Sequence, residues 1–180
     1  MALCDITKGK NIIACKDAVS GLKAIYVANY FDYEFETVQT ATDGNSLTDI
    51  GTLDTVFKYE LRNSGNTFNQ DNTSSRDNGT TIYTQTLNFI LTNISTEMEF
   101  QIRMFGLGRP IIFVEGNNGL FFVVGSKNGC EVTSKTELQG TMDSMNGYTL
   151  TAVATEKDPI FYLTSGAITS LKAIVSTDNL

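Results

Sequence analysis

The sequence predicts a mainly β protein with one flanking α-helix, arranged as an antiparallel β-sandwich or barrel. Apolar and polar residues alternate over several short segments, and turn-forming pairs such as Asn128-Gly129 separate these segments. Only one segment, near residue 100, combines a capping pattern with helical spacing. The 180 residues are the length of one ordinary domain, so we expect residues 1–180 to form a single domain.

The N-terminal part contains one predicted strand, followed by an alternating aromatic and acidic segment. Residues 1–21 are irregular and are expected to form an N-terminal arm. Residues 22–28 (LKAIYVA) have high strand propensity. From residue 31 onward, aromatic and acidic residues alternate strictly, which predicts a further strand. The acids on its polar face are Asp32, Glu34 and Glu36.

The longest polar segment lies between two predicted strands, residues 55–61 and 81–91. Residues 62–80 contain a single apolar residue, Phe68. We expect the two strands to pair as an antiparallel hairpin with residues 62–80 as its loop. Hairpin loops usually have about two to five residues, so a loop of this length favours a contact between subunits. The candidate contact residues are Asn63, Phe68, Asn69, Asp71, Arg76 and Asp77.

One helix is predicted over residues 96–105. Thr96 as N-cap and Glu99 three residues later fit the capping box. Glycines at 106 and 108 and Pro110 are expected to end the helix. The alternative of a strand stays open, because apolar residues also alternate from Met98 to Met104.

The C-terminal half contains the strongest strand signals. Residues 111–115 and 120–125 are continuous apolar runs around a Gly-Asn-Asn-Gly turn, which predicts a hairpin covered on both faces. Residues 148–156 alternate over a long strand, and residues 160–163 form a short last strand. The moderately apolar C-terminal segment, residues 166–180, is expected to add a strand or to dock as an arm.

Charge and cysteine content restrict the partners and the compartment. Thirteen basic residues against 20 acidic residues give a net charge of −7, the reverse of what phosphate binding needs. No apolar run reaches the roughly 18 residues of a membrane span, and the N-terminus lacks the layout of a secretory signal. Three cysteines without close spacing favour reduced thiols over a disulfide between Cys4 and Cys15. We expect a cytoplasmic protein or a component of a particle built there.

No catalytic or metal-binding constellation stands out, so we predict a protein that is not an enzyme and has no cofactor. The chain has no histidine, which removes the commonest general base and metal ligand. Neighbouring Cys15 and Lys16 do not establish a nucleophile, and Glu97 with Glu99 is a weak carboxylate pair. Residues 43–49 lack the spacing of a calcium loop.

The order of these segments resembles the tail tube proteins of long-tailed bacteriophages and related injection systems. The resemblance covers roughly residues 55–164. It rests on the strand at 87–91 leading into the helix, on Arg109-Pro-Ile-Ile-Phe-Val-Glu with its turn, on Val124-Gly-Ser-Lys-Asn-Gly and on Met145-Asn-Gly-Tyr-Thr-Leu-Thr-Ala-Val-Ala-Thr-Glu-Lys. It implies a virion structural protein of the tail, assembled in the host bacterial cytoplasm.

The resemblance also implies specific partners. Copies would form hexameric rings whose inner strands join into one closed barrel, and the rings would stack into a hollow tube beside other tail proteins. DNA would pass through an acidic lumen without specific binding, with no membrane partner, and the lumen candidates are Asp32, Glu34 and Glu36. The alternatives are a capsid decoration protein, a tail-terminator or neck ring, and a carbohydrate-binding β-sandwich module.

Overall fold

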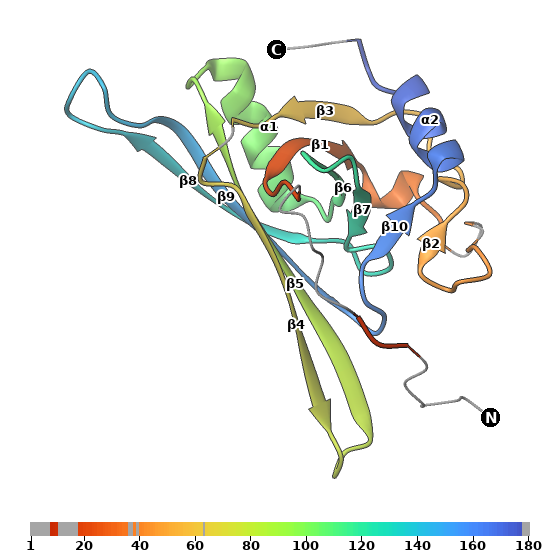
Figure 1. Cartoon of the computed structure of the whole chain (residues 1–180). Coiled ribbons are helices and arrows are strands. Elements are labelled where there is room, and N and C mark those ends of the chain that lie inside the picture. Colours follow the sequence, from red (N-terminus) through yellow and green to blue (C-terminus); the bar gives the residue numbers. More distant parts are fainter. Residues whose placement is uncertain (1–7, 11–17, 36–37, 39, 63, 178–180) are drawn as a thin grey trace.

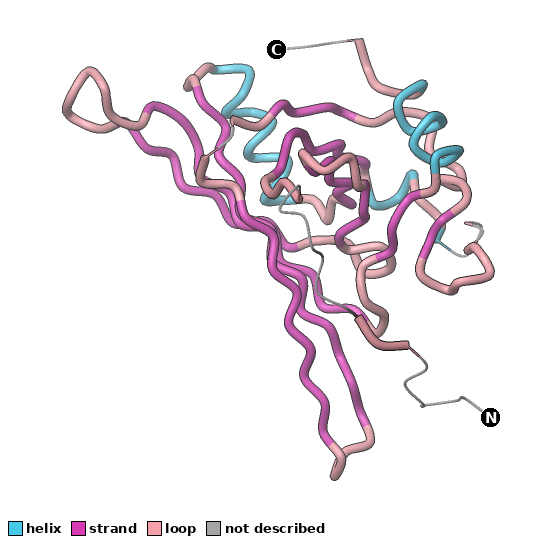
Figure 2. Tube along the Cα trace, viewed as in Figure 1, coloured by secondary structure: helices cyan, strands magenta, loops and turns pink. Residues whose placement is uncertain are grey.

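The computed structural model describes residues 8–10, 18–35, 38, 40–62 and 64–177. The described chain is mainly β, with two sheets, two α-helices and one 3-10 helix (Figures 1 and 2). The elements are β1 (Leu22–Ala28), η1 (Tyr30–Asp32), β2 (Ser46–Leu47), β3 (Phe57–Glu60), β4 (Thr67–Ser75), β5 (Thr80–Thr92), α1 (Thr96–Leu107), β6 (Ile111–Gly116), β7 (Phe121–Val124), β8 (Glu131–Leu138), β9 (Asn146–Glu156), β10 (Phe161–Leu163) and α2 (Ser165–Ala173).

The strands form a six-stranded sheet, ordered β2-β10-β7-β6-β1-β3, and a four-stranded sheet, ordered β4-β5-β9-β8. All strand pairs are antiparallel except β10 with β2. The mainly β prediction is therefore confirmed. The barrel alternative is wrong for the single chain, because β4 and β8 end the four-stranded sheet on opposite sides and do not meet.

The two sheets share one apolar core. Leu87 and Phe89 from β5 face Ile112 and Val114 from β6 across it, and all four side chains are fully buried. Helix α1 contributes two buried residues to the same core. The alternation of β9 is confirmed, because its buried hydrophobic residues are Tyr148, Leu150, Ala152 and Ala154.

A second core lies on the other face of the six-stranded sheet. Helix α2 covers this face through Ala167 and Leu171, together with the segments between β1 and β3. Every residue of β6 and β7 is buried, which confirms the prediction that this hairpin is covered on both faces. The central hairpin is therefore the most enclosed part of the fold (Figure 1).

The hairpin prediction around residues 62–80 is wrong in two ways. Strand β3 pairs with β1 in the six-stranded sheet instead of with β5. Residues 67–75 are not loop but strand β4, which pairs with β5 over nine residue pairs. Hydrophobic periodicity could not reveal β4, because Phe68 is its single apolar residue and its backbone is held by the ladder to β5.

Three smaller predictions need correction. Residues 31–35 contain a 3-10 turn instead of a strand, and the predicted common face of the aromatics is lost, because Tyr33 is buried whereas Phe31 is exposed. Helix α1 is confirmed, but its N-cap is Ser95, whose hydroxyl accepts a hydrogen bond from Met98 N at 3.1 Å. The C-terminal segment forms a second helix, α2, in place of a strand or an arm. The expected arm lies mostly outside the described residues.

Candidate functional site

The tip of the β4–β5 hairpin projects beyond the rest of the fold (Figure 1). Strand β9 pairs with β5 only from Tyr83 onward, so residues 73–75 and 80–82 form a two-stranded ribbon closed by the turn at 76–79. We call residues 73–82 the distal ribbon. Its side chains are exposed except for half-buried Ser75. A surface of this kind is available for contacts with another molecule.

The structure distributes the predicted contact residues over three places. Phe68 packs into the core between the sheets, and its ring centroid lies 4.7 Å from that of Phe122. Asn69 and Asp71 are exposed on β4. Arg76 and Asp77 lie in the turn that closes the distal ribbon. The sixth residue, Asn63, lies outside the described residues.

The outer face of the four-stranded sheet is polar, and we call it the open face. Strand alternation places on it the side chains of every second residue of each strand. Side-chain hydrogen bonds cross the strands: Asn88 Nδ2 donates to Thr67 Oγ1 at 3.2 Å, and Thr151 Oγ1 donates to Asn88 Oδ1 at 2.7 Å. The open face comprises Thr67, Asn69, Asp71, Thr84, Thr86, Asn88, Ile90, Glu131, Thr133, Lys135, Glu137, Thr149, Thr151, Val153 and Thr155.

Acidic groups outnumber basic groups on the open face. It has three carboxylates, on Asp71, Glu131 and Glu137, and one ammonium, on Lys135. Lys135 Nζ lies 2.7 Å from Glu137 Oε1, and Thr149 Oγ1 donates to Glu137 Oε2 at 2.9 Å. The hydrogen bond from Lys135, followed by that from Thr149, lowers the pKa of Glu137. The open face therefore has a net negative charge at neutral pH.

Both outer strands of the four-stranded sheet have a free backbone edge. In an antiparallel ladder, every second residue of a strand is hydrogen-bonded to the neighbouring strand. The bonds from Asn93 N to Asn146 O and from Gln139 N to Met145 O show which residues these are on each side of β9. The N–H and C=O groups that point away from the sheet belong to residues 68, 70, 72 and 74 in β4 and to residues 132, 134 and 136 in β8. Among the described residues, no strand pairs with either edge. Helix α1 packs beside β8, and Gly106 lies next to the Val132 carbonyl, so the part of the β8 edge that lies away from α1 is at residues 134 and 136.

The acidic residues predicted for a lumen lie elsewhere. Asp32 and Glu34 are exposed on the segment that follows β1, beside the six-stranded sheet. Asn29 Nδ2 donates a hydrogen bond to Asp32 Oδ2 at 3.0 Å. Glu36 lies outside the described residues. Neither of the two described acids belongs to the open face.

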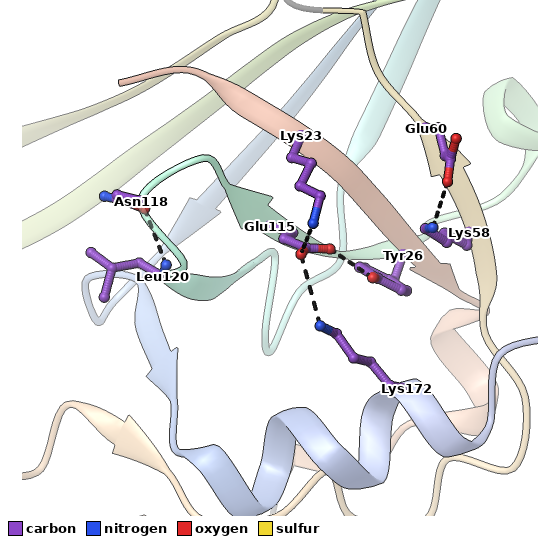
Figure 3. Close-up of polar contacts among 8 residues, drawn as sticks. All are labelled: Lys23, Tyr26, Lys58, Glu60, Glu115, Asn118, Leu120 and Lys172. Atoms are coloured by element: carbon purple, nitrogen blue, oxygen red, sulfur yellow. Dashed lines mark hydrogen bonds and ion pairs between the residues drawn. The ribbon is translucent and has the colours of Figure 1, made fainter. Parts of the chain in front are cut away.

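A buried carboxylate cluster joins β1, β6 and α2 (Figure 3). Glu115 is 6% exposed, and its Oε1 lies 2.9 Å from Lys23 Nζ and 3.8 Å from Lys172 Nζ. The Tyr26 hydroxyl donates to Glu115 Oε2 at 2.7 Å. Burial acts to raise the pKa of Glu115, but the hydrogen bonds from Lys23 and Tyr26 and the charge of Lys172 outweigh it and lower the pKa.

The protonation states of Tyr26 and Glu115 suit a structural role for this cluster. Burial and the neighbouring Glu115 carboxylate raise the pKa of Tyr26, so its hydroxyl remains a proton donor at neutral pH. The ionised Glu115 has partners on both oxygens. We therefore interpret the cluster as a polar cross-link between the central sheet and α2.

The buried thiol and the second buried carboxylate also have structural partners. Glu156 is 2% exposed, and its Oε1 accepts hydrogen bonds from Lys127 N at 3.0 Å and Asn128 N at 2.8 Å. These bonds hold the turn between β7 and β8. Burial, followed by the charge of Glu156, raises the pKa of Cys130 to about 12, so this thiol is not a thiolate at neutral pH.

Within the described ranges, no three or more His, Cys, Asp or Glu side chains are grouped so that they could hold a metal ion. No described helix has the length and apolar character needed to cross a membrane. No protein-family model, curated protein or solved structure matches this chain. The open face, its two edges and the distal ribbon are the exposed features of the four-stranded sheet.

Proposed function

We propose that the chain is a self-assembling structural subunit of a hollow tube, of the kind that the resemblance to phage tail tube proteins implies. The observation that supports this most directly is the pair of free edges on β4 and β8. Long, exposed edges are an aggregation hazard, which proteins avoid by covering the edges or by closing the sheet. Joining copies through these edges would remove both of them.

The strand directions permit such joining without a change of orientation. In the order β4-β5-β9-β8, every neighbouring pair is antiparallel, so β4 and β8 run in opposite directions. When a second copy is rotated about a ring axis, its β4 therefore lies antiparallel to β8 of the first. Repetition of this contact gives one continuous antiparallel sheet, which closes into a barrel because sheets twist and curve.

The open face suits the inside of that barrel. The opposite face of the four-stranded sheet is already covered by the core, so the open face is the one left for solvent. Its hydroxyl and amide groups give a hydrated wall, and its excess of carboxylates would repel phosphate. We propose that DNA slides along this wall without binding, which reassigns the lumen from Asp32 and Glu34 to Asp71, Glu131 and Glu137.

The distal ribbon has a different role in this arrangement. Edge pairing places neighbours beside the strands, whereas the ribbon extends past the end of β9, along the strand direction. A contact beyond the strand ends belongs to the next ring of a stack. We propose that the ribbon bridges successive rings.

Proline in β8 tests edge pairing. In Thr136→Pro, the lost N–H points away from β9, so the ladder within the chain is kept while the free edge is blocked. Thr136→Ala removes the same side chain and keeps the N–H. By negative-stain electron microscopy, we expect tubes or rings from the parent protein and from Thr136→Ala, and separate subunits from Thr136→Pro.

The proposal fails if the parent protein stays monomeric at high concentration in the presence of tail-initiation proteins, or if Thr136→Pro assembles normally. Unfolding in denaturant must show that the two variants are folded. Rings that never stack would favour the tail-terminator or neck-ring alternative over a tube.

A further inference from the structure

An apolar groove lies between α1, β3 and η1. Its wall includes Phe31, Phe57, Tyr59, Met104, Phe105 and Arg109, and its volume is about 260 Å³. Small-molecule sites usually enclose about 300–1,000 Å³, so this groove is small for a ligand of that kind. It suits the insertion of a single large side chain.

The groove is part of an unusually apolar surface. Phe31 is 92% exposed, and Phe57 and Met104 also expose a large part of their side chains. Phe100 and Leu107 extend the same apolar character along α1, where they are 57% and 72% exposed. A cluster of exposed apolar side chains typically marks a protein interaction site.

A second apolar surface lies on the loop that joins β8 to β9, residues 139–145. Met142 in this loop is fully exposed, and Leu138 at its base is 77% exposed. Of the eleven large hydrophobic side chains that are well exposed in the described residues, seven belong to the groove surface or to this loop and its base. Because the groove surface and the β8–β9 loop both expose apolar side chains, burying one against the other would favour a contact between copies.

The two surfaces are complementary in chemistry. The groove wall contains one charged residue, Arg109, whose guanidinium lies 4.7 Å from the Tyr30 ring centroid and donates to Asn128 O at 2.6 Å. The loop also contains one charged residue, Asp143, next to Met142. A thioether packs favourably against aromatic rings, and the groove is lined by them. Each surface therefore offers an apolar group and one charge, with opposite signs.

We propose that the β8–β9 loop of one copy inserts Met142 into the groove of a second copy, with Asp143 beside Arg109. Because loop and groove are different surfaces, the contact is heterologous, so it repeats from copy to copy and builds a ring or a filament. The inference rests on the proposed self-assembly and adds a second, side-chain contact to the backbone contact between β4 and β8. It identifies α1 as part of an assembly interface.

Cysteine cross-linking between copies tests the contact. In a Cys4→Ser, Cys15→Ser background, one preparation has Met142→Cys and the other Phe31→Cys; the remaining Cys130 is buried. We expect oxidation of the co-assembled mixture to give a disulfide-linked dimer that neither preparation forms alone. Ser170→Cys, at an exposed position on α2, replaces Phe31→Cys in the control mixture and is expected to give no dimer.

A substitution of Met142 measures how much this side chain contributes to assembly. We expect Met142→Asp to raise the protein concentration needed for assembly by about tenfold or more, as for the loss of an interface anchor. The contact between the loop and the groove would be overturned if the parent protein assembles but the cysteine pair forms no cross-link and Met142→Asp does not raise the concentration needed for assembly. Edge pairing between β4 and β8 would not be affected by that result. Absence of assembly in every preparation, with tail-initiation proteins present, would overturn the contact and the proposed function together.

Discussion

The two sheets differ in how their faces are used. The central hairpin of the six-stranded sheet, β6 and β7, has every residue buried, because the other sheet covers one face and α2 with its neighbouring segments covers the other. In the four-stranded sheet, β4 has no buried residue, and only alternate residues of β5 are buried from Gln85 to Leu91. One sheet is the centre of the fold, and the other is half core and half surface.

This difference separates stability from assembly. Side chains in the central hairpin are committed to the two cores, so changing them should mainly alter the free energy of unfolding. Side chains on the open face and the distal ribbon are exposed or half-buried and belong to neither core, so changing them should mainly alter contacts between copies. Paired substitutions in the two sheets should therefore separate a loss of stability from a loss of assembly.

The largest loss is expected from truncation in the central hairpin. Phe113 in β6 is fully buried, with its ring 6.1 Å from that of Tyr33 in an edge-to-face arrangement. Phe113→Ala should lower the free energy of unfolding by about 3–5 kcal/mol, because it leaves a cavity. Thr86→Ala, on the open face of β5, should change it by less than about 0.5 kcal/mol. If Phe113→Ala and Thr86→Ala lower the free energy of unfolding in denaturant equally, the proposed difference between the two sheets is wrong.

An intermediate effect is expected from the buried carboxylate, and it depends on pH. Glu115→Gln removes the charge that Lys23 and Lys172 face, and should cost about 1–3 kcal/mol at neutral pH. The pKa of Glu115 is lowered in the folded state, so the carboxylate's contribution is present above its ordinary pKa of 4.5 and is lost as pH falls through the folded pKa.

The effect of Glu115→Gln on the free energy of unfolding should depend on pH. The difference in unfolding free energy between the parent protein and Glu115→Gln should be constant near neutrality and should shrink as the medium becomes acidic. Glu60→Gln is the matched control, since Glu60 pairs with Lys58 on the exposed edge strand β3. A gap that widens toward low pH would contradict the assigned direction of the pKa shift.

Sequence reasoning succeeded where burial imposes a pattern. The apolar runs of β6 and β7 and the alternation of β9 follow from burial on two faces and on one face, respectively. Helix α1 was predictable from its capping and stop signals, although the cap is Ser95. Helix α2 was missed because only Ala167 and Leu171 are fully buried, which leaves a weak helical period.

The candidate site was harder to predict, because it is defined by surfaces. Strand β4 has no hydrophobic period, yet Asn78-Gly79 was an available hairpin-turn signal, and Gly79 has a φ of 62°. The two free edges follow from sheet order, which no local pattern records. The groove needs η1, β3 and α1 together, so only tertiary structure could reveal it.

A small change in stability is expected from shortening the distal ribbon. Thr73 and Ile82 are ladder partners, so residues 74–81 can be replaced by Asn-Gly, which closes a two-residue hairpin at that pair. The removed side chains are exposed or, for Ser75, half-buried, and a cross-strand contact joins the Ser74 and Thr81 hydroxyls at 3.0 Å. A two-stranded ribbon in water is marginally stable, so the free energy of unfolding should change by less than about 1 kcal/mol.

The same change should have a large effect on assembly. Edge pairing through residues 68–72 of β4 and 132–136 of β8 is untouched, so rings should still form. Stacking should be lost, because the ribbon is the part that reaches past the strand ends. Electron microscopy should then show rings without tubes, and Thr81→Ala, which only breaks the hydroxyl contact, should form tubes like the parent. Full-length tubes from the shortened chain would mean that ring-to-ring contacts lie elsewhere, and the division between a stabilising sheet and an assembling sheet would have to exclude the ribbon.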